Sequence, residues 1–172
     1  MKIIYSLSFV SLLAGWILPI HFRPWVTSYQ EFIAAISLFL LLFILIKNKI
    51  NYINKTDFII LSLAIIPALQ YSQNWIVYYG DALYGLVYIL LFWLSVFAAR
   101  NIENNQDGVN FQAWLGWTFV IGAVLSLIVA ILQWLKISEG ANIALFTPLR
   151  NSRPYANLAQ PNNLATLFGF GL

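Results

Sequence analysis

Four long apolar runs without a charged residue constrain this chain more than any other feature. They occupy residues 3–20, 32–46, 82–99 and 111–135. A helix that crosses the hydrocarbon core of a bilayer needs roughly 20 predominantly apolar residues. Charged residues make up only 9% of the 172-residue chain, against about a quarter in a typical soluble domain. We therefore predict an all-α, polytopic membrane protein.

A further apolar segment begins at Phe58 and is interrupted by Pro67 and two glutamines, Gln70 and Gln73. It could run as one kinked span to Tyr79 or end near Leu69, and both readings give the same number of crossings. The prediction is five full transmembrane helices and the start of a sixth at Pro161, in one transmembrane domain covering residues 1–172. Because the last apolar segment is shorter than a span, we expect this chain to be the N-terminal part of a longer protein.

Two residue counts exclude several kinds of site. The chain has no cysteine and one histidine, which leaves no disulfide, no thiolate metal site and no histidine cluster. We expect no metal and no cofactor. The first apolar run follows Lys2 like a signal peptide, but no small-x-small cleavage site comes after it. The sequence therefore favours a retained membrane anchor.

Basic residues indicate how the chain lies in the membrane. Lys47, Lys49 and Lys55 form the densest cluster and fall in a short loop, where the positive-inside rule applies most strongly. This places the N-terminus in the cytoplasm and makes 47–57 and 100–110 inner loops. The outer loops are then 21–31, about 70–81, and 136–160, which is the longest connection.

The closing stretch, RNSRPYANLAQPNNLATLFGFGL (residues 150–172), gathers polar groups in an otherwise apolar chain. Pro161 is suited to the first turn of a helix, so backbone N–H groups and the positive end of the helix dipole should lie at the outer face. Arg150 and Arg153 precede this helix start, an arrangement that suits a phosphate. Neutral donors in the same stretch are Asn157, Gln160, Asn162 and Asn163. Alternatively, the arginines contact lipid headgroups and the asparagines and prolines form turns.

Part of this stretch, SRPYANLAQPNNLATL, resembles the signature of bacterial protein O-oligosaccharyltransferases. These are protein glycosylation ligases of the PglL type, related to O-antigen ligases and Wzy-type glycan polymerases. LPIHFRPWVTSYQEF (residues 18–32) is similar to their first outer loop. IPALQYSQNWIVYYGDALYGLVYIL (residues 66–90) resembles their Pro-x-x-Gln and Gly-Asp-Ala region. One departure is Asn163, where many relatives are expected to have histidine.

The resemblance implies a reaction at the periplasmic face of the bacterial inner membrane. A glycan on undecaprenyl diphosphate would be transferred to a serine or threonine hydroxyl of a periplasmic protein such as pilin. Negative charge grows on the leaving diphosphate, which cationic and N–H donors would stabilise. The implied substrate-binding residues are Arg150 and Arg153 for the diphosphate, with Asn157, Gln160 and Asn162. No nucleic acid is expected as a partner.

The catalytic base is not assigned by this sequence. Histidine is the usual base near neutral pH, and the single histidine, His21, lies in the first outer loop beside Arg23. The resemblance implies that the essential histidine lies in a large periplasmic loop beyond these residues. His21 is thus a weak candidate, and we expect the chain to be inactive by itself.

Two other functions stay open. An O-antigen ligase or polymerase would share the donor chemistry and differ in the acceptor. A non-enzymatic transporter or assembly subunit belongs to another class, and a transporter should carry charges in the middle of its spans. Here the basic residues lie at span ends or in loops, which disfavours transport.

Three further residues invite structural predictions. Asp81 could cap a helix that begins at Ala82, hold a cation or pair with an arginine of the last loop. Gly122 and Ser126, four residues apart, could allow another helix to approach closely.

Overall fold

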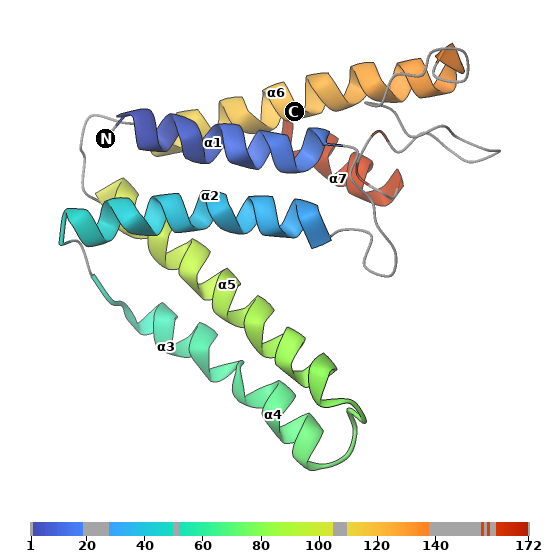
Figure 1. Cartoon of the computed structure of the whole chain (residues 1–172). Helices are drawn as coiled ribbons and strands as arrows, with labels where there is room; N and C mark the ends of the chain where they lie inside the picture. Colours follow the sequence, from blue (N-terminus) through green and yellow to red (C-terminus); the bar gives the residue numbers. More distant parts are fainter. Residues whose placement is uncertain are drawn as a thin grey trace. The chain divides into compact units, whose positions relative to one another are not determined.

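The computed structural model describes residues 2–18, 28–49, 52–104, 110–137, 156, 158 and 161–171. The described residues form helices connected by turns, with no strand among them, which confirms the all-α prediction (Figure 1). The helices are α1 (Lys2–Ile17), α2 (Ser28–Lys47), α3 (Lys55–Ser62), α4 (Ile65–Ser72), α5 (Tyr79–Asn104), α6 (Phe111–Trp134) and α7 (Pro161–Gly171).

Three helices in the described part of the chain are long and apolar enough to cross a membrane, namely Tyr29–Lys47, Tyr79–Asn104 and Phe111–Trp134. The apolar helix Ile3–Ile17 is shorter. Large apolar side chains are exposed along these helices, as they would be on a surface that faces lipid. The total of five spans and the orientation of the N-terminus stay predictions.

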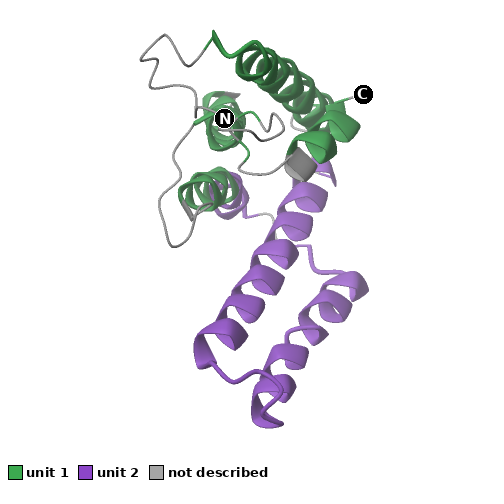
Figure 2. Cartoon of the chain, turned by 90° about the vertical axis from the view of Figure 1, so that its right-hand side faces the viewer, with its two compact units in different colours: residues 1–40, 109–172 green, residues 41–108 purple. Residues whose placement is uncertain are grey.

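The chain divides into two compact units, coloured separately in Figure 2. Unit 1 contains residues 1–40 and 109–172, and unit 2 contains residues 41–108. The prediction of a single transmembrane domain is not decided by this division.

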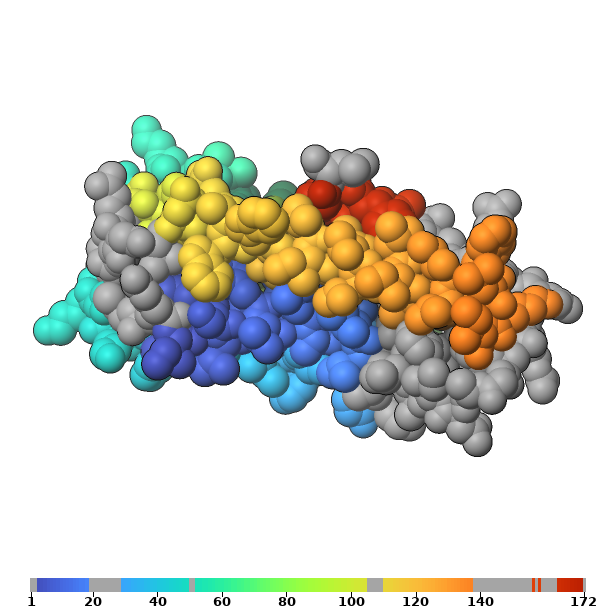
Figure 3. Space-filling view, turned by 90° about the horizontal axis from the view of Figure 1, so that it is seen from above, coloured from blue at the N-terminus to red at the C-terminus, as the bar shows by residue number. Residues whose placement is uncertain are grey.

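In unit 1, α1 and α6 run in the same direction. The ring of Phe9 lies 5.8 Å from that of Phe111, and seven residues further along α1 the ring of Trp16 lies 5.1 Å from that of Phe119. Figure 3 shows α6 lying along α1, with α7 beside α6. The second helix, α2, runs the opposite way from α1, because Ser8 bonds to Ser37 whereas Ser11 bonds to Ile33.

A glycine on α6 makes the approach of α1 close. A Cβ atom placed on Gly122 would lie 2.6 Å from the Trp16 ring and 3.4 Å from Leu13. Ser126, one turn further along, is also buried. The predicted close approach at Gly122 and Ser126 is thus confirmed for Gly122, where α1 is the neighbouring helix.

In unit 2, α3 and α4 together run antiparallel to α5. Asp57 of α3 bonds to Trp93 and Arg100 in the second half of α5, whereas Pro67 of α4 packs on Gly85 near its start. The helix breaks at residues 63–64, before the proline rather than at it. Proline has no N–H for the carbonyl four residues earlier and its ring clashes with that carbonyl. Ser72 ends α4, between the two ends that the sequence allowed.

Polar side chains attach the loop before α3 to the end of α5. Asn54 caps α3 in a capping box with Asp57. Asn101, which is fully buried, accepts a bond from the Tyr52 N–H at 2.8 Å and donates to the Tyr52 carbonyl at 3.1 Å. A helix side chain therefore holds both backbone groups of one loop residue.

Candidate functional site

Most of the predicted site residues lie outside the described residues. These are His21, Arg150, Arg153, Asn157 and Gln160. Asn162 lies in the first turn of α7, although its side chain is outside the described set. The helix start at Pro161 is confirmed, since α7 spans Pro161–Gly171.

Two residues of the closing motif, Ala156 and Leu158, are described, and both are buried in unit 1. The side-chain amide of Gln133, near the end of α6, bonds to both backbone groups of Ala156. Its Nε2 donates to the Ala156 carbonyl at 2.8 Å, and its Oε1 accepts from the Ala156 N–H at 2.9 Å. We call this pair of bonds the Gln133 clamp.

The backbone held by this clamp has an uncommon conformation. Ala156 has a φ of 52°, in the left-handed region that side chains with a Cβ rarely adopt. Ala156 and Leu158 also pack in a hydrophobic cluster with Val129 and Ala130 of α6 and with α7. Hydrogen bonds and apolar packing therefore act together on this part of the motif.

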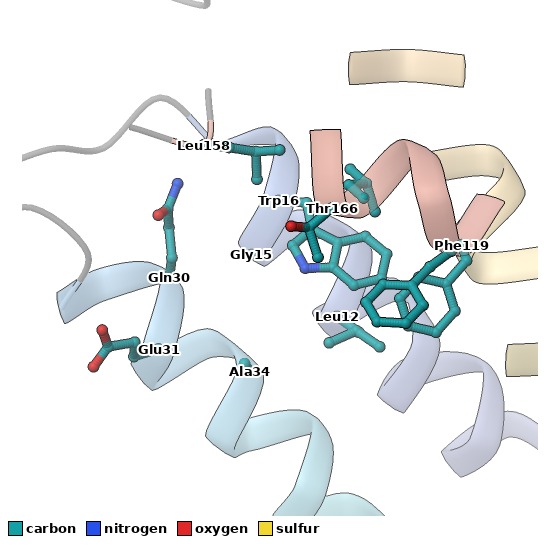
Figure 4. A pocket seen from close by; sticks show the side chains of 11 residues that line it. Leu12, Gly15, Trp16, Gln30, Glu31, Ala34, Phe119, Leu158 and Thr166 are labelled. Atoms are coloured by element: carbon teal, nitrogen blue, oxygen red, sulfur yellow. The ribbon is translucent and has the colours of Figure 1, made fainter. Parts of the chain in front are cut away.

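A pocket of about 420 Å³, lined in part by Leu158, lies between helices of unit 1 (Figure 4). In Figure 4, Trp16 and Phe119 lie together on one side, and Gln30, Glu31 and Ala34 of α2 lie on the other. The remaining lining residues are Leu12, Gly15, Leu158, Thr166, Leu167 and Phe170. Most of the lining is apolar, so the pocket suits a hydrocarbon group better than a charged one.

The described residues contain no group of histidine, cysteine or acidic side chains that could hold a metal ion. The acidic residue Asp81 is exposed in the first turn of α5. The prediction that it caps a helix starting at Ala82 is wrong, because the helix begins at Tyr79. The N–H of Asp81 already bonds to the Tyr78 carbonyl. Its carboxylate lies in the first turn of α5, where the positive end of the helix dipole stabilises a negative charge.

The two glutamines near Pro67 do not line the pocket described between α4 and α5. That pocket, of about 190 Å³, is lined by Ala64, Ala68, Tyr71, Tyr79, Ala82, Leu83 and Leu86. Gln73 stands at the C-terminal cap of α4. Gln70 therefore lies in the last turn of α4 and Gln73 directly after it, at the end of the helix.

Sequence reasoning missed Gln133. The signal was present, since Gln133 is a polar amide near the C-terminal end of the apolar run 111–135. A polar group in such a run is costly unless it is hydrogen-bonded. Its partner could not be named from sequence, because Ala156 is a small apolar residue whose backbone makes the contact.

Comparison with known proteins finds relatives of one kind. The chain is 29% identical over 159 residues to a general O-oligosaccharyltransferase of Acinetobacter baylyi, covering 92% of this chain and 28% of that protein. It is 30% identical over 142 residues to a ComP-specific O-oligosaccharyltransferase of the same organism, covering 82% of this chain and 25% of that protein. The chain thus spans about a quarter of the length of these curated relatives.

No protein-family model matches the chain, and no solved structure is significantly similar to it. The relationship therefore rests on sequence, and it extends well beyond the closing motif. The chain is related to bacterial O-oligosaccharyltransferases, as its closing motif predicted.

Proposed function

We propose that this chain belongs to a multi-pass glycosyltransferase of the bacterial inner membrane that performs O-linked protein glycosylation. The enzyme would transfer a glycan from undecaprenyl diphosphate to a serine or threonine hydroxyl of a periplasmic protein such as pilin. The observation that carries this proposal is the similarity to two O-oligosaccharyltransferases over most of the chain.

In the proposed reaction the acceptor oxygen attacks the sugar carbon bonded to the diphosphate. The carbon–oxygen bond to the diphosphate breaks, and the lipid diphosphate leaves with the electron pair. Arg150 and Arg153 would stabilise the charge that grows on it. Asn157, Gln160 and Asn162 would orient the diphosphate or the first sugar, beside the N–H groups at the start of α7. The base that takes the hydroxyl proton is not assigned, and His21 stays a weak candidate.

The direction of the helices supports the proposed topology. Because α1 and α6 run in the same direction in unit 1, an odd number of crossings must separate them. Counting α2, the broken pair α3–α4, and α5 gives three crossings. The first residue of α7 then lies on the same side as the last residue of α6, which we place at the periplasmic face.

The test uses a full-length gene that carries these residues, in a ligase-deficient host with a lipid-linked glycan and a pilin. Pilin mass is read for the wild type and for Arg153→Ala and Gln160→Ala. Removal of one group that stabilises transition-state charge costs roughly 10²–10³-fold in rate. We expect both variants to lose most glycosylation at unchanged membrane abundance.

Matched changes outside the motif are Lys136→Ala and Gln112→Ala, at two exposed positions near opposite ends of α6. They should leave pilin glycosylation unchanged. If the motif variants also match the wild type, the assignment of the donor site is wrong. If pilin stays bare while lipopolysaccharide gains the glycan, the acceptor is wrong and the protein is an O-antigen ligase. Absence of both products contradicts the transferase proposal.

A further inference from the structure

We infer that Gln133 is a positioning residue, which holds the closing motif in place through the backbone of Ala156. This inference rests on the proposed function, because the motif matters for transfer only if it binds the donor. The role differs from that of Arg153 or Gln160, since Gln133 acts through another residue.

The first argument is the cost of placing an amide at this position. Gln133 is 2% exposed in an apolar helix, where an unpaired amide would be strongly unfavourable. A methionine or leucine could fill the space without that cost. What an apolar side chain cannot do is bond to both the N–H and the carbonyl of Ala156. Those backbone groups are themselves buried, and they would otherwise lack these partners.

The second argument is the conformation that the clamp maintains. A φ of 52° at Ala156 is unfavourable for any residue with a Cβ. Such a conformation persists only when the surroundings determine it more strongly than the local preference. Here the two hydrogen bonds from Gln133, which lie in a low-dielectric interior, hold Ala156 in this conformation.

The third argument is what the clamp is attached to. Ala156 and Leu158, the residues bonded to Asn157 on either side, are both anchored in the hydrophobic cluster with α6 and α7. Arg153 is three residues before Ala156, and Gln160 is four residues after it. The clamp therefore fixes the backbone of the motif at a point between these two proposed donor-binding residues. A misplacement of about 1 Å can cost about 100-fold in rate.

The experiment uses the purified full-length enzyme with a lipid-diphosphate-linked glycan and an acceptor peptide. Gln133→Met keeps the length of the side chain and removes both hydrogen bonds. We expect the amide of Ala156 to exchange hydrogen at least about tenfold faster, and the transfer rate per folded enzyme to fall by roughly 10–100-fold. Either equal exchange at Ala156 or an equal transfer rate in Gln133→Met and the wild type would overturn the inference.

Two controls isolate the role of the clamp. Gln112→Met makes the same change at an exposed position of the same helix and should change neither measurement. Asn101→Leu removes a similar pair of bonds, to Tyr52 in unit 2, and should not affect exchange at Ala156. If Asn101→Leu lowers the transfer rate as much as Gln133→Met does, the effect is a general loss of structure and the inference is wrong.

A rescue distinguishes positioning from packing. Ala156→Gly permits the left-handed conformation without a steric penalty, so adding it to Gln133→Met should restore transfer by about threefold or more. If Gln133 served only to fill space in α6, removing a methyl group at Ala156 would lower activity further.

The two proposals fail in different ways. If the wild-type enzyme transfers no glycan to any acceptor, the proposed function fails, and the positioning role fails with it, whatever the exchange shows. If the wild type transfers glycan and Gln133→Met does so equally fast, only the positioning role is contradicted.

Discussion

At the residue scale, Asp57 shows how one buried carboxylate organises its surroundings. It accepts bonds from the Asn54 N–H at 2.6 Å, from Trp93 at 3.0 Å and from Arg100 at 2.5 Å. Asp57 lies at the end of the predicted inner loop 47–57. Burial raises the pKa of this carboxyl, but the bonds from Asn54, Arg100 and Trp93 outweigh it and hold the pKa below its ordinary value of 3.8.

We predict that Asp57→Asn destabilises unit 2 by roughly 2–3 kcal/mol, because it leaves the Arg100 guanidinium without its carboxylate partner. The measurement is thermal unfolding in detergent. Asp81→Asn is the matched control, since Asp81 is exposed at the start of α5 and should change stability by about 1 kcal/mol or less. Equal effects of the two changes would contradict the importance of the Asp57 contacts.

The wild type and Asp57→Asn also differ in how their stability should depend on pH. Because the pKa of Asp57 is lower in the folded state, its contribution is fully present above pH 3.8 and is lost as the pH falls through the folded-state pKa. The stability advantage of the wild type over Asp57→Asn should therefore shrink on acidification below that value. An advantage that grows with acid would show that the sign is wrong.

At the element scale, small residues decide where helices meet and where they break. Gly122 allows α1 to reach α6, whereas Pro67 breaks a helix four residues before itself and then packs on Gly85. The sequence showed both residues, and it predicted a close approach and an interruption. It did not show that α1 is the neighbour or that the break falls at residues 63–64.

For the first of these contacts, we predict that Gly122→Ala destabilises unit 1 by about 1 kcal/mol. The added Cβ would lie 2.6 Å from the Trp16 ring, and relieving such overpacking costs about 1–3 kcal/mol. Part of this is offset because alanine favours a helix over glycine by about 1 kcal/mol. The measurement is thermal unfolding in detergent micelles.

Gly116→Ala is the control on the same helix. Nothing lies within 4 Å of a Cβ at Gly116, so only the gain in helix propensity should appear, as a stabilisation of up to about 1 kcal/mol. If both substitutions stabilise the protein, α1 does not pack closely at Gly122.

At the scale of the whole molecule, membrane topology is the property that can be tested most directly. The chain contains no cysteine, so a single introduced cysteine is the one residue in it that a maleimide can label. Ile53 lies between α2 and α3, Val77 lies between α4 and α5, and both side chains are exposed. The proposed orientation places them on opposite sides of the membrane.

We predict that a membrane-impermeant maleimide, added from the periplasmic side, labels Val77→Cys and not Ile53→Cys. Permeabilised cells should show labelling of both variants, which controls for access, and the cysteine-free chain should show none. Labelling of Ile53→Cys alone in intact cells would reverse the orientation. Labelling of both in intact cells would contradict α3–α4 as a crossing.

The sequence by itself determined the class of protein and its relatives. Long uncharged apolar runs form helices in lipid, because a helix satisfies its own backbone groups. The closing motif is a continuous stretch of sequence, so its resemblance to known ligases can be read without a structure. Pro161 opens α7 as predicted, since proline fits a first turn in any context. These features are local, so neighbouring residues suffice to specify them.

Only the tertiary structure decided which distant residues meet. Gln133 and Ala156 are 23 positions apart, and their bonds involve a backbone that carries no sequence signal. Asp57 and Arg100 likewise pair across 43 positions, although each alone resembles an ordinary loop charge. The prediction that Asp81 caps a helix starting at Ala82 was wrong, because α5 begins at Tyr79. The Tyr78 carbonyl already accepts a hydrogen bond from the Asp81 N–H. Contacts between helices depend on packing in three dimensions, which no single segment encodes.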